Sequence, residues 1–218
     1  SLILNDGAYF NGAAAGATAT NVNIWAGPVT LNGTVNLYGT IGGVQHTILG
    51  SISGPGTLVK NGNSTSTLWL MATNNTYAGG TIVSNGTLYA RFATSLPGSN
   101  AVVAGATSAV HASDGTFGFT GEQLRSLNLA TAFLGNTAYL SIDTAYASLE
   151  CAGDLPRSMG LIKLGTNSLS LARNAVLGNV TSYDGALSFG GNNVVSGNLA
   201  VVCGKATLTG TNTFIGTG

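Results

Sequence analysis

One short signature recurs along this chain and limits the folds that the chain can adopt. The segment NTYAG at residues 75–79 returns as NAVLG at 174–178 and as NTFIG at 212–216. The first two copies lie 99 residues apart, and Leu70 recurs at the same distance as Leu169. The third copy follows after 38 residues, which predicts inserted or divergent segments within the long unit. Repeats that cannot bury their own apolar faces must stack on neighbours, so a solenoid is predicted.

The residues between the turn signals alternate in polarity. The sequence NIWAGPVTLNGTVNLYGT at 23–40 places Val29, Leu31 and Val35 at alternate positions. This period of two, bounded by Asn-Gly and Gly-Pro, is typical of short strands joined by tight turns. Helix signals are almost absent, and the best candidate is residues 121–129, predicted to form one or two turns.

The repeat decides between a sandwich, a barrel and a solenoid, which the alternation alone does not separate. We predict an all-β chain that folds as a parallel β-helix (β-solenoid) of roughly nine to eleven coils, each with about 20 to 25 residues. Residues 1–218 are treated as a single β-helix domain with a less repetitive middle segment at about 104–158. The predicted inward residues are Leu58, Leu68, Leu70, Ile82, Leu88, Leu161, Leu169, Leu171, Leu187, Phe189, Leu199, Val201 and Leu208.

Charged residues are scarce in this chain. They make up 6% of it, against about 25% in an ordinary soluble domain. The formal net charge at pH 7 is zero, and no run of Lys or Arg could neutralise a phosphate backbone, so we expect no nucleic-acid partner. The same neutrality leaves little repulsion between copies of the chain. No apolar stretch reaches the roughly 18 residues of a spanning helix, so no transmembrane segment is predicted.

Several phrases together resemble a known repeat. The phrase SISGPGTLVK at 51–60 is followed by LWL at 68–70, NTYAGGT at 75–81 and NGTL at 85–88. This order resembles the autotransporter-associated β-strand repeat of bacterial passenger domains. A second, weaker copy occupies 160–187. The resemblance implies a right-handed parallel β-helix that is exported to the cell surface, and it implies no activity.

The acidic residues offer little support for an enzyme. Asp143, Glu150 and Asp154 lie close in sequence, with Arg157 near them, but no Asp-x-Asp pair occurs. Because glycoside hydrolysis needs two carboxylates at a fixed separation, we interpret these residues as solvated loop charges. No catalytic residue, cofactor or metal site is predicted. An enzyme that cleaves polysaccharides with these carboxylates is the rival interpretation.

The two histidines are isolated from other possible ligands. Neither His46 nor His111 has a Cys or carboxylate at ligand spacing, so both are interpreted as surface or turn residues.

Aromatic residues and cysteines leave further alternatives open. Trp25, Trp69 and Tyr77 are candidates for a sugar-stacking face, although such residues more often belong to a ladder or a core. Cys151 and Cys203 form either one disulfide or two small buried hydrophobic residues.

Together these features predict a non-enzymatic structural or adhesive protein, extracellular or on the outer surface of a bacterium. A polysaccharide-binding or polysaccharide-cleaving β-helix is the alternative. The expected partners are surface glycans, a host or neighbouring cell surface, and further copies of the chain.

The stacking of copies end to end is a separate expectation. Residues 2–4 form a short apolar strand, and the third signature stops before the strand that follows the other two. An exposed coil edge covered by another copy would build a filament. A longer passenger in which the next coil belongs to the same chain is the alternative.

Overall fold

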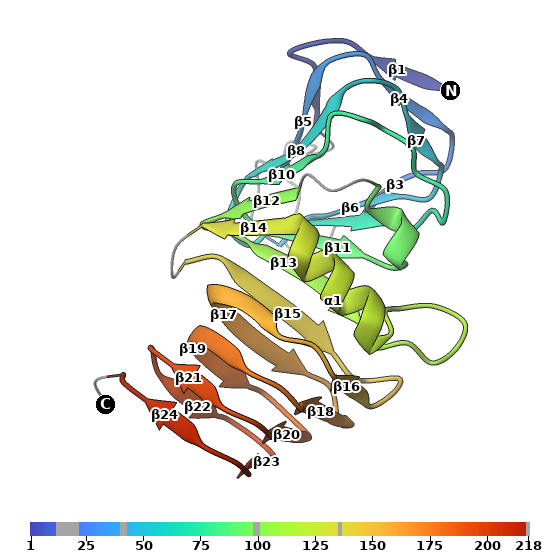
Figure 1. Cartoon of the computed structure of the whole chain (residues 1–218). Coiled ribbons are helices and arrows are strands. Elements are labelled where there is room, and N and C mark those ends of the chain that lie inside the picture. The colour runs from blue at the N-terminus through green and yellow to red at the C-terminus, as the bar shows by residue number, and fades with distance from the viewer. Residues whose placement is uncertain (12–21, 40–42, 98–100, 135–136, 217–218) are drawn as a thin grey trace. The chain divides into compact units, whose positions relative to one another are not determined.

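The chain folds as a parallel β-solenoid. The computed structural model describes residues 1–11, 22–39, 43–97, 101–134 and 137–216, which form about eight turns. Each strand pairs in parallel with a strand one turn away, as the stacked ribbons of Figure 1 show. The predicted all-β parallel β-helix is confirmed. The predicted coil count was slightly high, because the helix and loops of the middle segment use residues without adding a complete turn.

The described residues divide into two compact units, Ser1–Ser108 and Ala109–Gly218. The strands of the first unit are β1 (Leu2–Leu4), β2 (Tyr9–Phe10), β3 (Val22–Trp25), β4 (Val29–Leu31), β5 (Thr34–Gly39), β6 (Gln45–Ile48), β7 (Ile52–Ser53), β8 (Thr57–Gly62), β9 (Thr67–Leu70), β10 (Thr81–Val83), β11 (Thr87–Ala90) and β12 (Ala101–Ala104). A 3₁₀ turn, η1, covers Ala93–Ser95.

Three sheets run through the first unit, and consecutive strands along the chain belong to different sheets. Their strand orders are β1-β4-β7, β2-β5-β8-β10-β12 and β3-β6-β9-β11. Thr34 pairs with Thr57, 23 residues further on, whereas Thr67 pairs with Thr87 after 20 residues. The turns of this unit therefore differ in length, which hides the repeat from a search for a fixed period.

β13 (Thr107–His111) spans the boundary between the units. The remaining elements are α1 (Gly121–Ala130), β14 (Thr131–Leu134), β15 (Tyr139–Asp143), β16 (Leu149–Cys151), β17 (Leu155–Leu164), β18 (Ser168–Leu171), β19 (Ala175–Ser182), β20 (Ala186–Phe189), β21 (Asn193–Val195), β22 (Leu199–Val201), β23 (Lys205–Leu208) and β24 (Asn212–Phe214). Within the second unit the strand orders are β15-β17-β19-β21-β24 and β16-β18-β20-β23, and β22 also pairs with β19.

The helix α1 lies where the sequence predicted one. Its amino end carries a capping box: the Thr120 hydroxyl accepts a hydrogen bond from the Gln123 backbone N–H, and the Gln123 side chain accepts one from the Thr120 N–H. Such reciprocal bonds satisfy donors that a helix start leaves unpaired. Leu124 is fully buried and anchors the helix, while Glu122 and Arg125 face solvent. The less repetitive segment at 104–158 thus contains the one described α-helix.

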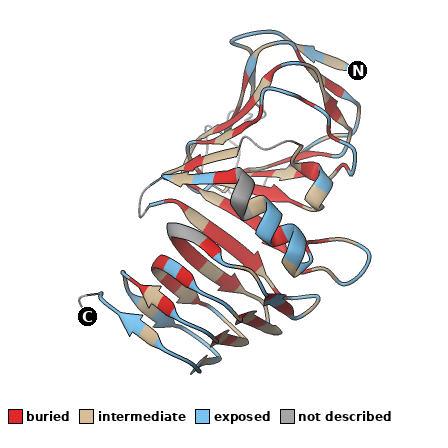
Figure 2. Cartoon of the chain, in the orientation of Figure 1, coloured by how far each residue is buried: buried red, intermediate tan, exposed pale blue. Residues whose placement is uncertain are grey.

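Most predicted inward residues are buried in both units, as the red strand positions in Figure 2 indicate. Ile82 is an exception, since Thr81 and Val83 face inward on β10 and Ile82 is only half-buried. Leu199 is half-buried, and Val201 and Leu208 are exposed. These three lie on the last described turn, where no further described strand covers their inward positions. The confirmed residues are Leu58, Leu68, Leu70, Leu88, Leu161, Leu169, Leu171, Leu187 and Phe189.

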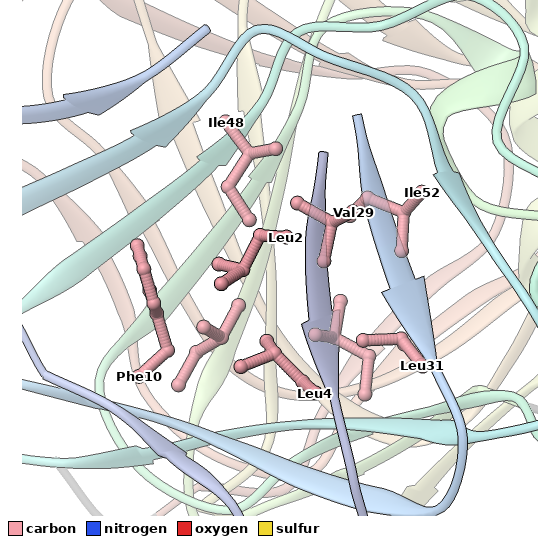
Figure 3. Close-up of a pocket in the computed structure, with 9 residues that line it drawn as sticks. Leu2, Leu4, Phe10, Val29, Leu31, Ile48 and Ile52 are labelled. Carbon is pink, nitrogen blue, oxygen red and sulfur yellow. The ribbon is translucent and has the colours of Figure 1, made fainter. Parts of the chain in front are cut away.

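At the first turn, apolar side chains from several strands point into the interior. Leu2 and Leu4 of β1 face this space together with Phe10, Val29 and Leu31 (Figure 3). The space between these side chains leaves no room for a water molecule. Ile3, between the two leucines, is exposed. The short apolar strand expected at residues 2–4 therefore pairs with β4 and contributes Leu2 and Leu4 to the core.

Candidate functional site

Of the three aromatic residues predicted as a sugar-stacking face, Tyr77 lies inside the core. Tyr77 is buried, with 2% of its surface exposed, and its hydroxyl lies 2.6 Å from the Thr81 hydroxyl. Burial raises the pKa of Tyr77 to about 12. A side chain with both ring faces covered cannot stack on a sugar, so the prediction for Tyr77 was wrong.

The two tryptophans occupy different positions in the first unit. Trp25 is half-buried at the end of β3, in register with the buried Ile48 and edge-on to the Phe10 ring at 6.3 Å. Trp69 is half-buried on β9, and its ring stacks parallel to that of Tyr89 with centroids 4.1 Å apart. The first is a packing contact within one turn and the second a packing contact between neighbouring turns. A glycan-binding role for either tryptophan stays a prediction.

Cys151 and Cys203 are both free thiols. Cys151 is buried on β16, and Cys203 is exposed just before β23. β18 and β20 lie between these two strands, so three strand spacings of about 4.8 Å separate the positions, more than the roughly 7 Å that a disulfide can span between Cα atoms. The disulfide alternative was therefore wrong, and the buried alternative holds for Cys151 alone. Burial raises the pKa of the Cys151 thiol to about 12.

Asp143, Glu150 and Asp154, which are close in sequence, lie in three different environments. Asp143 ends β15, and its Oδ1 accepts a hydrogen bond from Ala145 N at 2.8 Å. Glu150 is exposed on β16, and Asp154 lines a surface cleft with Arg125 and Arg173. Within the described ranges, no group of three or more His, Cys, Asp or Glu residues could hold a metal ion. The side chain of Arg157 lies outside the described parts.

The structure brings His111 next to Asp143, a pair that no feature of the sequence indicates. His111 Nδ1 lies 3.4 Å from Asp143 Oδ2. The His111 ring also packs edge-on against Phe117 at 5.6 Å and Tyr146 at 5.3 Å. His111 is buried, so the prediction of a surface or turn histidine was wrong. The aromatic contacts hold the loops after β13 and β15 together, while Tyr146 stays mostly exposed.

His46 is also buried, contrary to the prediction of a surface residue. It faces the interior on β6, in register with Leu68, and no described residue forms a hydrogen bond with its ring nitrogens. Burial, and then the nearby Lys60 charge, lowers the pKa of His46 below its usual value. His46 is therefore a neutral core residue at pH 7.

Lys60 is buried inside the first unit and bonds to three oxygens. Its Nζ donates to Asn61 O and Ser66 Oγ at 2.9 Å and to Asn85 O at 3.0 Å. Burial lowers its pKa to about 8. Gly86, at φ +73°, keeps this corner open, since a Cβ there would lie 2.6 Å from Lys60 Nζ. The lysine thus bonds to both sides of the corner between β8 and β9, at Asn61 and Ser66, and to the corresponding corner of the next turn, at Asn85.

Lys163 forms the equivalent clamp in the second unit. Its Nζ donates to Thr144 Oγ1 at 2.8 Å, to Leu164 O at 3.1 Å and to Gly165 O. Thr144 belongs to the preceding turn and in addition donates its hydroxyl to Leu164 O. Burial lowers the pKa of Lys163, and the carboxylates of Asp184 and Asp143 oppose this shift. A Leu-x-Lys-x-Gly phrase occurs at both sites, at 58–62 and at 161–165, and is the one feature of the sequence that marks these clamps.

Buried asparagines connect turns in the same manner. Asn75 Oδ1 accepts a hydrogen bond from Ile52 N, and its Nδ2 donates to Ser95 O, both at 2.8 Å. In the second unit, Asn193 Oδ1 accepts from Ala175 N at 3.1 Å, and its Nδ2 donates to Asn212 Oδ1 at 2.9 Å. Each asparagine therefore joins three successive turns.

Comparisons with known proteins identify no relative: no protein-family model, no curated protein and no solved structure matches this chain. The likeness to the autotransporter-associated repeat therefore rests on the quoted motifs alone. None of the described helices has the length and apolar character needed to cross a membrane.

Proposed function

We propose that this chain is a non-enzymatic structural or adhesive solenoid, located outside a bacterial cell or on its outer surface. The observation that carries the proposal is the use made of buried polar side chains. Lys60, Lys163, Asn75 and Asn193 each form at least one hydrogen bond to a residue of a neighbouring turn. A stack held by such bonds and by continuous leucine rows is suited to a stiff support.

The exterior is consistent with this role. Charged residues are few, and polar solvation comes from Asn, Ser and Thr, which suits an inert exported surface. The motif resemblance to bacterial passenger repeats supports a location at the cell surface.

Labelling of intact cells tests the location. Antibodies raised against the purified chain are applied to intact and permeabilised cells of the organism that encodes it. We expect equal staining of both. Staining that requires permeabilisation would contradict a surface location.

A turnover assay tests the non-enzymatic part. The purified chain is incubated with a panel of neutral and acidic polysaccharides, and new reducing ends are measured. We expect none above the level of the heat-denatured chain. Turnover that is lost in Asp154→Asn or Asp143→Asn would favour the polysaccharide-cleaving alternative.

A further inference from the structure

A polar cleft lies on the surface of the second unit, beside α1. Its volume is about 280 Å³, and it is lined by Glu122, Arg125, Ala152, Gly153, Asp154 and Arg173. The lining comes from the helix, from the loop between β16 and β17, and from the corner after β18. It is therefore formed where the helical insertion meets the regular turns, and regular scaffolds commonly carry binding residues on such insertions.

Two glycines bring the helix close to the turns. A Cβ on Gly153 would overlap the Cδ of Arg125, so this side chain lies directly on the Gly153 backbone. A Cβ on Gly121 would overlap Glu150 O, so the first turn of α1 packs tightly against β16. The buried Leu124 anchors the helix, and the Arg125 side chain lies along the Gly153 backbone and lines the cleft.

The charges in the cleft are concentrated and balanced. Two of the chain's seven basic residues and two of its seven acidic residues line this one cleft. Arg125 Nη1 pairs with Glu122 Oε1 at 3.2 Å. Arg173 and Asp154 form no ion pair with any residue that the structure describes. A guanidinium donor and a carboxylate acceptor are thus both available at the same opening.

This combination matches the chemistry of a sugar ring. Of two neighbouring hydroxyls, one can donate to a carboxylate while the other accepts from a guanidinium. The cleft is electrically balanced, so it offers no excess charge for an anion. Its volume is just below the roughly 300 to 1,000 Å³ of pockets for drug-sized ligands, which suits a single ring.

We propose that this cleft binds one ring of a neutral saccharide, with Arg173 donating to and Asp154 accepting from its hydroxyl groups. Arg125, which contacts Gly153 and pairs with Glu122, lines the cleft beside them. The inference rests on the adhesive part of the proposed function. Surface labelling of cells can succeed while saccharide binding fails, so the two failures are distinguishable.

The test is an NMR titration of the ¹⁵N-labelled full chain with glucose, galactose, mannose and N-acetylglucosamine. Each sugar is added up to about 50 times the protein concentration, because we expect a dissociation constant on the order of millimolar. We expect one sugar to shift the amide signals of Gly153 and Arg173 saturably. Arg173→Ala and Asp154→Asn should each weaken this binding about tenfold or more, as expected for lost hydrogen bonds to charged groups.

Glu150→Gln and Lys205→Ala are the matched controls, because both residues are exposed in the second unit and lie outside the cleft. They should leave the affinity unchanged. Unaltered amide signals elsewhere show that each variant is folded. The proposal is overturned if no sugar shifts these signals, if the cleft variants bind like the controls, or if glucuronate binds and the neutral sugars do not.

Discussion

At the scale of single residues, the buried lysines are the least expected feature. An ammonium group inside a protein must lose its proton or find oxygen acceptors, since its transfer from water is costly. Lys60 and Lys163 each have three acceptors, mostly backbone carbonyls at a corner. The folded state nevertheless holds the proton of Lys60 less tightly than the unfolded state does, because burial lowers the pKa from 10.5 to about 8.

This difference predicts how stability depends on pH. Between about pH 8 and 10.5 the unfolded chain binds more protons at Lys60 than the folded chain, so the contribution of Lys60 to the free energy of unfolding rises with pH in this range. Urea unfolding at pH 7.5, 9 and 10 measures the effect as the difference between the wild type and Lys60→Met. Burial of Cys151 acts in the opposite direction above pH 9 in both proteins and therefore cancels. Parallel pH profiles would contradict the prediction.

Leucines at inward positions should dominate stability. Leu70 and Leu169 are fully buried, whereas Thr76 is exposed. Leu→Ala at either position should lower the free energy of unfolding by about 2 to 5 kcal/mol, through lost burial and a cavity. Thr76→Ala should change it by less than about 0.5 kcal/mol. Denaturant titration of the three variants checks this, and equally small effects would show that the inward face is misassigned.

At the scale of elements, strand alternation and turn residues predicted the fold well. The alternating stretch quoted at 23–40 contains β4 (Val29–Leu31) and β5 (Thr34–Gly39), which are joined by a tight turn as predicted. The inserted segment predicted for the 99-residue unit is α1 with its loops. Val176, Val194 and Thr213 are in register, so the second and third signatures lie two turns apart, and NVVSG at 193–197 is the copy between them. The 38-residue interval therefore contains no insertion.

The site could not be predicted to the same extent. Partners such as His111 and Asp143 lie on different turns, and the length of the middle segment hides their proximity. The same holds for Arg125, Asp154 and Arg173, because only the docking of α1 brings them to one cleft. Burial of Lys60 was missed because lysine is almost never fully buried, and the repeated Leu-x-Lys-x-Gly phrase does not by itself show that its lysine points inward.

The asparagine bridges should stabilise the stack in proportion to the groups they satisfy. Asn75→Ala would leave Ile52 N and Ser95 O without their partners, so we expect a loss of about 1 to 3 kcal/mol in the free energy of unfolding. The neighbouring Asn74 is exposed and serves as the control, with Asn74→Ala expected to be neutral. Thermal or urea unfolding compares the two, and a similar loss in both would argue against a bridging role.

At the scale of the whole molecule, the last described turn exposes residues at inward positions. Leu208 and Phe214 are in register with the buried Phe189 and Val195, yet they are 47% and 42% exposed. In the isolated 218-residue chain, at zero net charge, we expect these side chains to drive association that increases with concentration.

Sedimentation equilibrium measures this association. Phe214→Lys should shift the chain toward the monomer, because it places a charge among the exposed apolar side chains. Val176→Lys is the control, since Val176 is 40% exposed at an outward position of β19. A chain that stays monomeric at high concentration, or a control that acts as strongly as Phe214→Lys, would rule out association through this turn.

The chain has three lysines, and Lys205 alone is exposed, while Lys60 lies in one unit and Lys163 in the other. A reagent that acylates primary amines will therefore modify native side chains at Lys205 and reach the two clamp lysines only when their turns open. Because each unit contains one protected amine, the masses of the modified peptides report the opening of each unit separately. The protein thus contains two natural probes of its own local unfolding, one for each half of the chain.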